Sequence, residues 1–272
     1  MTIDSHFYLY LAALFGAGVA SGFAGGLFGL GGGILRVPVL LYLFPAFSVA
    51  GDHVFHLAAG TSLALAIPTC LGSVLRQRKE SNLDVPLLKV WIPALLVGVA
   101  IGLLVSRVVG GSALRILFIV FLISQALYIL IPNRPRISEV LPGRVVLSGV
   151  SSAVGGVSVL LGLSGGVMTT PILMAFGQSI HRAVAVSSAG GLALSVAATV
   201  GMIINGLGVS GRPAYSLGYI DLPAVALMIP AVLISSSLGV RVSNRIPARV
   251  LEVVFGVFLV GLIVDMVHEV MR

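Results

Sequence analysis

Long stretches without an ionisable side chain restrict the fold of this sequence more than any other feature. No Asp, Glu, Lys or Arg occurs between Ser5 and Leu35, or between Val145 and His181. Charged residues make up 9% of the 272 residues, whereas a soluble domain has about 25%. A helix needs about 20 apolar residues to cross a bilayer, so most of the chain is used by membrane segments. We therefore predict an all-α polytopic membrane protein without a separate soluble domain.

Ten apolar segments divide the chain. They lie at about residues 7–28, 34–46, 55–75, 86–107, 112–132, 145–162, 166–178, 183–206, 219–240 and 249–269. The second and the seventh are too short to span a bilayer upright. We expect broken or re-entrant helices there, next to glycine-rich motifs.

The sequence contains an internal repeat. Residues 83–122 align with 220–259 without a gap, and 14 of the 40 positions are identical. Upstream, residues 28–33 match 161–166, and 59–62 match 185–188. Each copy holds five segments, an odd number, so we expect the second copy to be inverted in the membrane. The predicted division is a first repeat at 1–133, a basic cytoplasmic linker at 134–144 and a second repeat at 145–272.

The distribution of basic residues favours this inversion. With the N-terminus outside, 12 Lys and Arg residues fall on the cytoplasmic side and four on the external side. Four crossings per repeat would give nine against six, with Arg36 unassigned. The positive-inside rule therefore favours two inverted repeats of five segments.

Glycine-rich breaks occur at equivalent positions of the two repeats. Three consecutive glycines end at Gly33, and the matching break ends at Gly166. A helix that restarts after such a break exposes free amides and a positive dipole end, which suits an anion. Paired breaks of this kind are typical of transporter binding sites. The four-residue spacing of Gly18, Gly22 and Gly26 instead suits close helix packing, within one chain or in a homodimer.

Polar side chains lie near both breaks. Hydroxyl pairs at Thr61 and Ser62, and at Ser187 and Ser188, are either substrate ligands or partners of their own helix backbone. Arg36 follows the first break, where an arginine at the bilayer centre costs roughly 3 kcal/mol. It is either a topology-determining charge or an anion-attracting side chain. Its equivalent in the second repeat is Thr169.

Other polar residues have simpler interpretations. Asp84 and Asp221 each precede a proline and an apolar run, which predicts helix N-caps. His56 and Arg182 each lie five residues before a hydroxyl pair, where a helix begins. Asp52, His53 and His56 lack a fourth ligand for a metal site.

Several functions are disfavoured by the sequence. It has no P-loop motif for ATP hydrolysis, and the glycine runs lack the setting of a dinucleotide fold. We therefore expect no cofactor. The net charge of +7 is scattered in small groups without a basic face, which argues against nucleic acid as a partner. The sequence places no carboxylate in mid-membrane, so it does not decide whether a proton or a sodium ion is the coupling ion.

The motifs resemble those of the TauE/SafE sulfite exporter family. The resemblance rests on Gly-Leu-Phe-Gly-Leu-Gly-Gly-Gly at 26–33 with Pro38, on Ala-Gly-Thr-Ser-Leu at 59–63, and on the degenerate second copy. It covers about residues 10–268. It implies a prokaryotic inner-membrane transporter of small anions such as sulfite, thiosulfate, sulfoacetate or related sulfonates.

Together, the breaks and the resemblance give a set of candidate substrate-binding residues. They are Gly31, Gly32, Gly33, Ile34, Arg36, Thr61, Ser62, Ser164, Gly165, Gly166, Val167, Thr169, Ser187 and Ser188. We expect alternating access around a site near the midplane of the bilayer, with no catalytic residue. A passive anion channel and a non-transporting membrane assembly protein are the alternatives.

Overall fold

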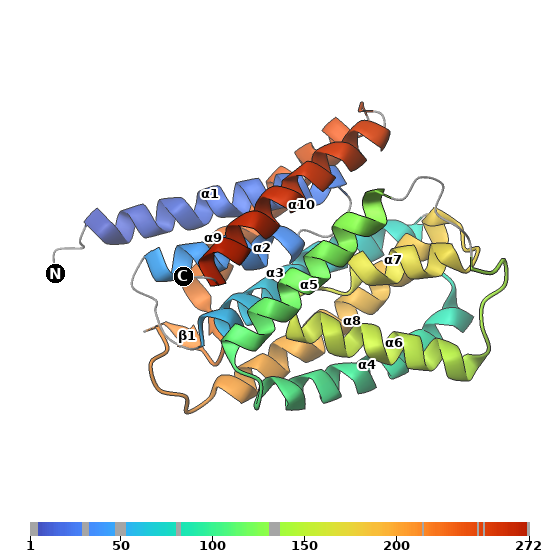
Figure 1. Cartoon of the computed structure of the whole chain (residues 1–272), viewed down its shortest axis with the longest axis horizontal. Helices are drawn as coiled ribbons and strands as arrows, with labels where there is room; N and C mark the ends of the chain where they lie inside the picture. The colour runs from blue at the N-terminus through green and yellow to red at the C-terminus, as the bar shows by residue number, and fades with distance from the viewer. Residues whose placement is uncertain are drawn as a thin grey trace.

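The computed structural model describes residues 5–28, 33–46, 53–79, 83–130, 137–213, 215–243, 245–246 and 248–270. Ten helices occupy these residues, and each coincides with a predicted segment to within a few residues (Figure 1). They are α1 Ser5–Phe28, α2 Gly33–Ala46, α3 Val54–Lys79, α4 Val85–Ser106, α5 Gly111–Leu130, α6 Arg144–Leu160, α7 Gly166–Ala175, α8 Ile180–Gly206, α9 Leu222–Ser243 and α10 Ala248–Val270. The predicted all-α fold is confirmed.

Six helices are long and apolar enough to cross a membrane. These are α1, α3, α4, α5, α8 and α9. The outer faces of the bundle carry apolar side chains, such as Leu104, Ile234 and Val257, each more than half exposed. A surface of this kind suits contact with lipid rather than water. The chain is therefore a multi-pass membrane protein.

The short helix α7 returns to the end of the bundle from which α6 starts. The amides of Ile137 and Ser138, which precede α6, donate to the carbonyl oxygen of Ala175 at 2.8 and 3.3 Å. Since Ala175 is the last residue of α7, both ends of the α6–α7 hairpin lie on the same side, at the right of Figure 1. Helix α7 therefore turns back toward the start of α6 and does not run on to the opposite end of the bundle.

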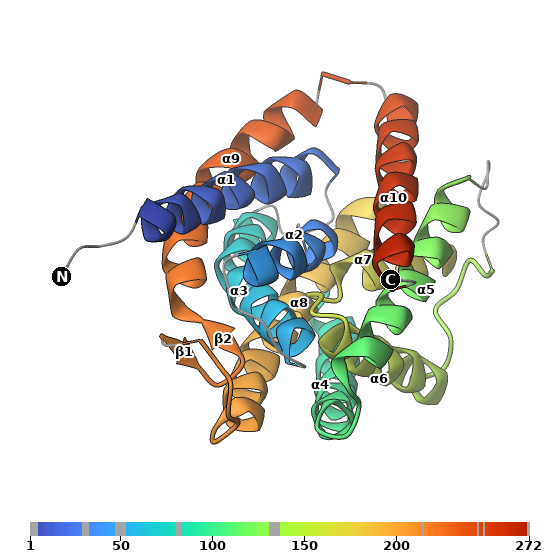
Figure 2. The ribbon, with the colours of Figure 1, turned by 60° about the vertical axis from the view of Figure 1, so that its left-hand side comes forward.

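The helices of the two halves pack in a symmetric pattern. In sequence order, α1 to α5 correspond to α6 to α10. Helix α1 packs against α9, and its equivalent α6 packs against α4. Likewise α3 packs against α8, and α5 against α10. Figure 2 shows α1 beside α9 at the top and α4 beside α6 at the bottom. Exchanging the two halves therefore leaves these helix pairs unchanged.

The equivalent helices α3 and α8 run in opposite directions. A side chain added at Gly60 would lie 3.4 Å from Cβ of Met202. Further along α3, the hydroxyls of Ser73 and Ser188 are 2.6 Å apart. Residue numbers rise along α3 as they fall along α8, so the pair is antiparallel. We call the end where α3 begins the His56 end, and the end where α4 and α8 begin the Asp84 end.

The glycines spaced by four serve packing within the chain. A Cβ added at Gly18, Gly22 or Gly26 would collide with α9, where the added atom at Gly18 would lie 2.9 Å from Ala231 Cβ. Only glycine allows the two backbones to approach this closely. The spacing is thus explained without a second copy of the chain.

A short β-hairpin between α8 and α9 is absent from the sequence-based prediction. Strands β1 Ser216–Leu217 and β2 Ile220–Asp221 pair through a turn in which Gly218 has a φ of +59°. The hairpin leads directly into α9. It brings Asp221 to the position that caps this helix.

Both predicted aspartate N-caps are confirmed. Asp84 Oδ1 accepts a hydrogen bond from the Leu87 amide at 3.2 Å, and Asp221 Oδ1 accepts from the Ala224 amide at 2.7 Å. Asp221 is buried, and this burial raises the pKa of its carboxyl group. The hydrogen bond from the Ala224 amide partly offsets the shift in this pKa.

Candidate functional site

The second glycine-rich motif forms a tight break between α6 and α7. Gly162 has a φ of +70° and Gly165 a φ of +78°, a left-handed conformation that glycine adopts without strain. Ser62 of α3 donates a hydrogen bond to the Gly162 carbonyl oxygen at 2.8 Å. The first repeat therefore holds the break of the second repeat through one of the predicted hydroxyls.

The first motif reaches the same place. Gly31 and Gly32 lie outside the described residues, and Gly33 is the first residue of α2. A Cβ added at Gly33 would lie 3.3 Å from Leu163 Cδ2 and 3.5 Å from its Cα. The start of α2 is thus packed against the break before α7. Gly33 of the first motif and Leu163 of the second, 130 residues apart in the sequence, thus meet inside the bundle.

Arg36 lies one turn after this contact and is only 1% exposed. Its Nε and Nη1 atoms are buried, and neither has a hydrogen-bond partner among the described residues. A cation that only sets topology would reach the membrane surface with its charged head in water. The burial of Arg36 disfavours that interpretation.

The remaining residues at the two helix starts are also buried. Ile34 is 1% exposed, and Val167 and Thr169 of α7 are 3% and 2% exposed. Ser164 lies in the break itself and is buried too. These predicted residues are therefore gathered in the interior, around the contact between α2 and the α6–α7 break.

The four predicted hydroxyls divide into different environments. Thr61 accepts a hydrogen bond from the Asp221 amide at 3.0 Å, which ties α3 to the β-hairpin. Ser187 lies near the start of α7, with its hydroxyl 3.5 Å from the Gly166 carbonyl oxygen. Ser188 donates to the Val184 carbonyl oxygen at 2.8 Å and contacts Ser73. Helix-backbone bonding thus accounts for the hydroxyl of Ser188, and a structural bond for that of Thr61.

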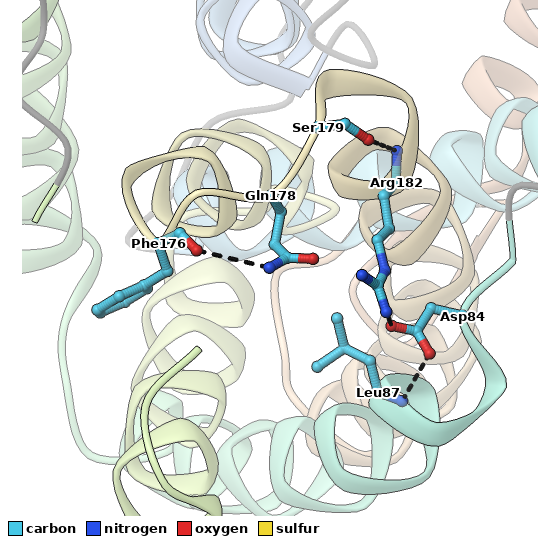
Figure 3. A network of polar contacts seen from close by, with 6 residues as sticks. All are labelled: Asp84, Leu87, Phe176, Gln178, Ser179 and Arg182. Atoms are coloured by element: carbon cyan, nitrogen blue, oxygen red, sulfur yellow. Dashed lines mark hydrogen bonds and ion pairs between the residues drawn. The ribbon is translucent and has the colours of Figure 1, made fainter. Parts of the chain in front are cut away.

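An ion pair joins the two halves at the Asp84 end (Figure 3). Arg182, near the start of α8, binds Oδ2 of Asp84, whose other oxygen caps α4. Ser179 caps α8 by accepting a hydrogen bond from the Arg182 amide. Arg182 is 48% exposed and Asp84 is 9% exposed, so the pair lies at the rim of the bundle. The sequence predicts only local roles for both residues at helix starts.

The equivalent residues at the His56 end are arranged differently. Nε2 of His56, the counterpart of Arg182, lies 3.0 Å from the carbonyl oxygen of Ser106. Its Nδ1 atom is buried, with no hydrogen-bond partner in the described part of the chain. Asp221, the counterpart of Asp84, accepts a hydrogen bond from the Ala224 amide instead. The ion pair at one end therefore has no equivalent at the other.

Metal binding finds no support in this part of the molecule. Among the described residues, no group of three or more His, Cys, Asp or Glu side chains is placed to hold an ion. Asp52, one member of the cluster considered from the sequence, lies outside the described residues.

The comparisons with known proteins agree with this architecture. The family model described as sulfite exporter TauE/SafE matches residues 14–266. The chain belongs to the TauE/SafE family. A probable membrane transporter protein of Haemophilus influenzae is 30% identical to this TauE/SafE protein over 262 residues, which are 95% of this chain and 98% of the relative.

An archaeal relative is similarly close. A probable membrane transporter protein of Methanocaldococcus jannaschii is 29% identical over 270 residues, which are 94% of this chain and 95% of the relative. No solved structure gives a significant match. The family and these relatives support a membrane transporter.

Proposed function

We propose that this TauE/SafE protein is a secondary transporter of small sulfur-containing or organic anions, of the sulfite, thiosulfate or sulfonate class. The observation that carries the proposal is Arg36, a buried cation whose Nε and Nη1 have no hydrogen-bond partner among the described residues. It lies beside the contact between the start of α2 and the break before α7. We place the protein in the prokaryotic inner membrane with its N-terminus outside, in agreement with the distribution of basic residues.

The energetics of Arg36 favour an anionic partner. An uncompensated charge in a protein interior costs about 3–5 kcal/mol, so a buried cation is normally paired. No described carboxylate fills this role, since Asp84 binds Arg182 and Asp221 caps α9. An anion that enters from water gains a charge-assisted hydrogen bond here and relieves the cost of the buried cation. One transport cycle then consists of binding this anion at Arg36 from one side of the membrane and releasing it to the other.

The starts of α2 and α7 add backbone donors to this site. The first amides of a helix have no partner within the helix, and the helix dipole favours negative charge there. Gly33 and Ile34 begin α2, and Gly166 and Val167 begin α7. Together with Arg36, these amides replace part of the hydration that an oxyanion loses on entering the bundle.

Differences between the two ends support alternating access. At the Asp84 end, Arg182 binds Asp84 and Ser73 binds Ser188. The repeat equivalents of the serine pair are Ser62 and Thr199, which are not bonded to one another. Ser62 binds the Gly162 carbonyl oxygen, and Thr199 Oγ1 is buried with no hydrogen bond to any described residue.

We infer from this asymmetry that the Asp84 end is closed in this conformation. Inverted repeats exchange their conformations when access alternates. In the opposite state, the contacts at the Asp84 end separate, and those between Ser62 and Thr199 and between His56 and Asp221 form. The inverted orientation of the two repeats, with the Asp84 end cytoplasmic, is part of the same proposal.

The ion pair gives a direct prediction. Replacing Arg182 by glutamine should open the Asp84 end more often, because a partly exposed ion pair contributes about 0.5–1 kcal/mol. In a Cys70→Ser background, a cysteine introduced by Ser188→Cys reports this opening through its rate of thiol labelling. We expect the Arg182→Gln change to raise that rate about two- to fivefold. Arg182→Lys, which keeps the charge, is the matched control, and an equal rise in both variants would contradict the gate.

Flux measurements separate the proposed carrier from its two alternatives. Purified protein in liposomes is tested with sulfite, thiosulfate, sulfate and a small sulfonate, with and without proton and sodium gradients. A carrier gives saturable flux at low turnover, and the gradient that drives it identifies the coupling ion. A channel gives currents that far exceed carrier turnover. Absence of flux for every anion, in protein that remains folded, would favour the non-transporting alternative.

A further inference from the structure

We propose that the anion-binding pocket extends from Arg36 to Cys70 and Ser195, and that it selects simple oxyanions over aminosulfonates. This inference rests on the proposed function and names the substrate chemistry of the same site. Neither Cys70 nor Ser195 was singled out by the sequence motifs. Both lie deep in the bundle, Cys70 on α3 and Ser195 on α8, and they are 8% and 0% exposed.

Polar side chains from four segments converge on the Cys70 thiol. Arg36 on α2 lies one turn after Gly33, which packs against Leu163 next to Ser164, and its charge acts on the thiol. Ser164, in the break before α7, and Ser195, one turn after Gly191 on α8, lie in the neighbourhood of the thiol. Thr69 lies there as well, although its hydroxyl is bonded to the Ala66 carbonyl oxygen at 2.9 Å. The breaks and the central helix pair thus share one polar centre.

Two members of this group have unused donors. Nε and Nη1 of Arg36 are buried and have no hydrogen-bond partner among the described residues. The same is true of Oγ of Ser195, which is also buried and has no such partner. Buried polar atoms are normally hydrogen-bonded, since leaving one unsatisfied costs about 1–3 kcal/mol. Two such residues beside the same thiol point to a polar ligand that both of them bind.

The pocket lies at the interface of the two repeats. The offset of 126 residues that relates Thr61 to Ser187 also relates Thr69 to Ser195, so two of the three hydroxyl residues near the thiol are repeat equivalents. Opposite the thiol is Gly191 of α8. A Cβ added there would lie 3.2 Å from Cys70 Sγ and 2.8 Å from the Ser164 carbonyl oxygen. Glycine at this position lets α8 approach both the thiol and the break before α7 closely.

The available groups define the ligand. Arg36 offers only N–H donors, and Ser195 offers an O–H, so the ligand must present acceptor oxygens and negative charge. No acidic side chain among the described residues takes part in this pocket. An ammonium group would therefore be placed near Arg36 without a carboxylate to compensate its charge. We infer that a sulfonate with a neutral tail binds, and that its amino analogue is rejected.

The native cysteine provides the test. Cys70 is the only cysteine of the chain, so the unmodified full-length protein in liposomes can be labelled at this site alone. Two methanethiosulfonate reagents of similar size are compared, one with an anionic sulfonatoethyl group and one with a cationic trimethylammonioethyl group. We expect the anionic reagent to react at least tenfold faster, because it enters as a substrate analogue. Arg36→Gln should remove this preference, whereas Arg36→Lys and the exposed control Arg245→Gln should retain it.

Protection by ligands tests the specificity. We expect 2-hydroxyethanesulfonate and sulfate to slow the labelling at least fivefold, and 2-aminoethanesulfonate at the same concentration to slow it less than twofold. Ser195→Ala should reduce the protection at least threefold, while the hydroxyl deletion Ser124→Ala on α5 should leave it unchanged.

Each contrary outcome overturns a stated part of this inference. Equal labelling rates with the anionic and the cationic reagent would exclude Arg36 and Cys70 from a common pocket. A preference for the anionic reagent that persists in the Arg36→Gln variant would exclude it as well. A thiol that reacts only after unfolding, even with the small neutral methyl reagent, would also exclude it. Equal protection by the amino compound would overturn the selectivity. Protected, charge-selective labelling without any flux would leave the pocket in place and reject transport alone.

Discussion

Replacing Arg36 by methionine should abolish anion flux and at the same time raise the unfolding temperature of the ligand-free protein. Methionine is similar in length and apolar, so it fills the same space without a charge. Exchanging buried ionic groups for well-packed apolar ones stabilises proteins by about 1–4 kcal/mol. The side chain of Arg36 is fully buried, and two of its nitrogens have no partner in the part of the chain that the structure describes, so we expect a stabilisation within this range.

The loss of flux has the same physical origin. Truncating one partner of a buried charge pair costs about 2–5 kcal/mol, which corresponds to a loss of about 30- to 4,000-fold in anion binding. Both effects are measured on the same purified protein, the flux after reconstitution into liposomes and the thermal unfolding in detergent. Arg36→Lys keeps the charge and should retain part of the flux without the gain in stability. A methionine variant that is less stable than the native protein would show that Arg36 has a structural partner.

Replacing Gly162 by alanine should strongly destabilise the protein and stop transport. Gly162 has a φ of +70°, and an added Cβ would lie 2.5 Å from Ala59 Cα and 2.9 Å from Val37 Cγ2. The left-handed conformation costs a non-glycine residue about 1 kcal/mol, and overpacking costs about 1–3 kcal/mol more. We therefore expect a loss of about 2–4 kcal/mol. The Ser62 hydrogen bond to the Gly162 carbonyl oxygen should be lost with it.

Two other glycines provide matched controls for this change. An added Cβ at Gly16 of α1 or Gly149 of α6 meets no atom within 4 Å. Alanine is the better helix former, so both substitutions should leave stability unchanged or raise it by up to about 1 kcal/mol. Denaturant or thermal unfolding of the three variants tests this order. A Gly162→Ala protein that is as stable as Gly16→Ala would mean that the break is not as tight as described.

Those parts of the fold that depend on a short stretch of sequence, such as a helix or its N-cap, could be predicted from the sequence. The long uncharged runs located the helices, and an aspartate before a proline located the caps at Asp84 and Asp221. The hairpin before α9 was missed, since its strands have only two residues each and no alternating pattern. The glycines at 208, 211 and 218, all with positive φ, mark the turns around it.

The candidate site was only partly accessible to sequence reasoning. The repeat pointed to both breaks, and Gly33 does pack against Leu163. The position of Cys70 beside Ser164 and Ser195 depends on how α3 and α8 cross, which no local pattern encodes. A hydroxyl in an apolar helix also has several uses. Thr61, predicted as a ligand, binds the Asp221 amide, a contact made by a hairpin that the sequence did not reveal.

The central claim is that an anion is carried through the bundle by pairing with Arg36, and exchange transport tests it most directly. Liposomes containing the protein are loaded with unlabelled sulfite and placed in sulfur-35-labelled sulfite. We predict saturable uptake that is faster than uptake into liposomes that contain the same protein but no internal sulfite, since a carrier exchanges one anion for another. We also predict that this uptake is lost in Arg36→Gln protein that remains folded. Unchanged exchange in the Arg36→Gln variant, or uptake that is indifferent to internal sulfite, would contradict the account.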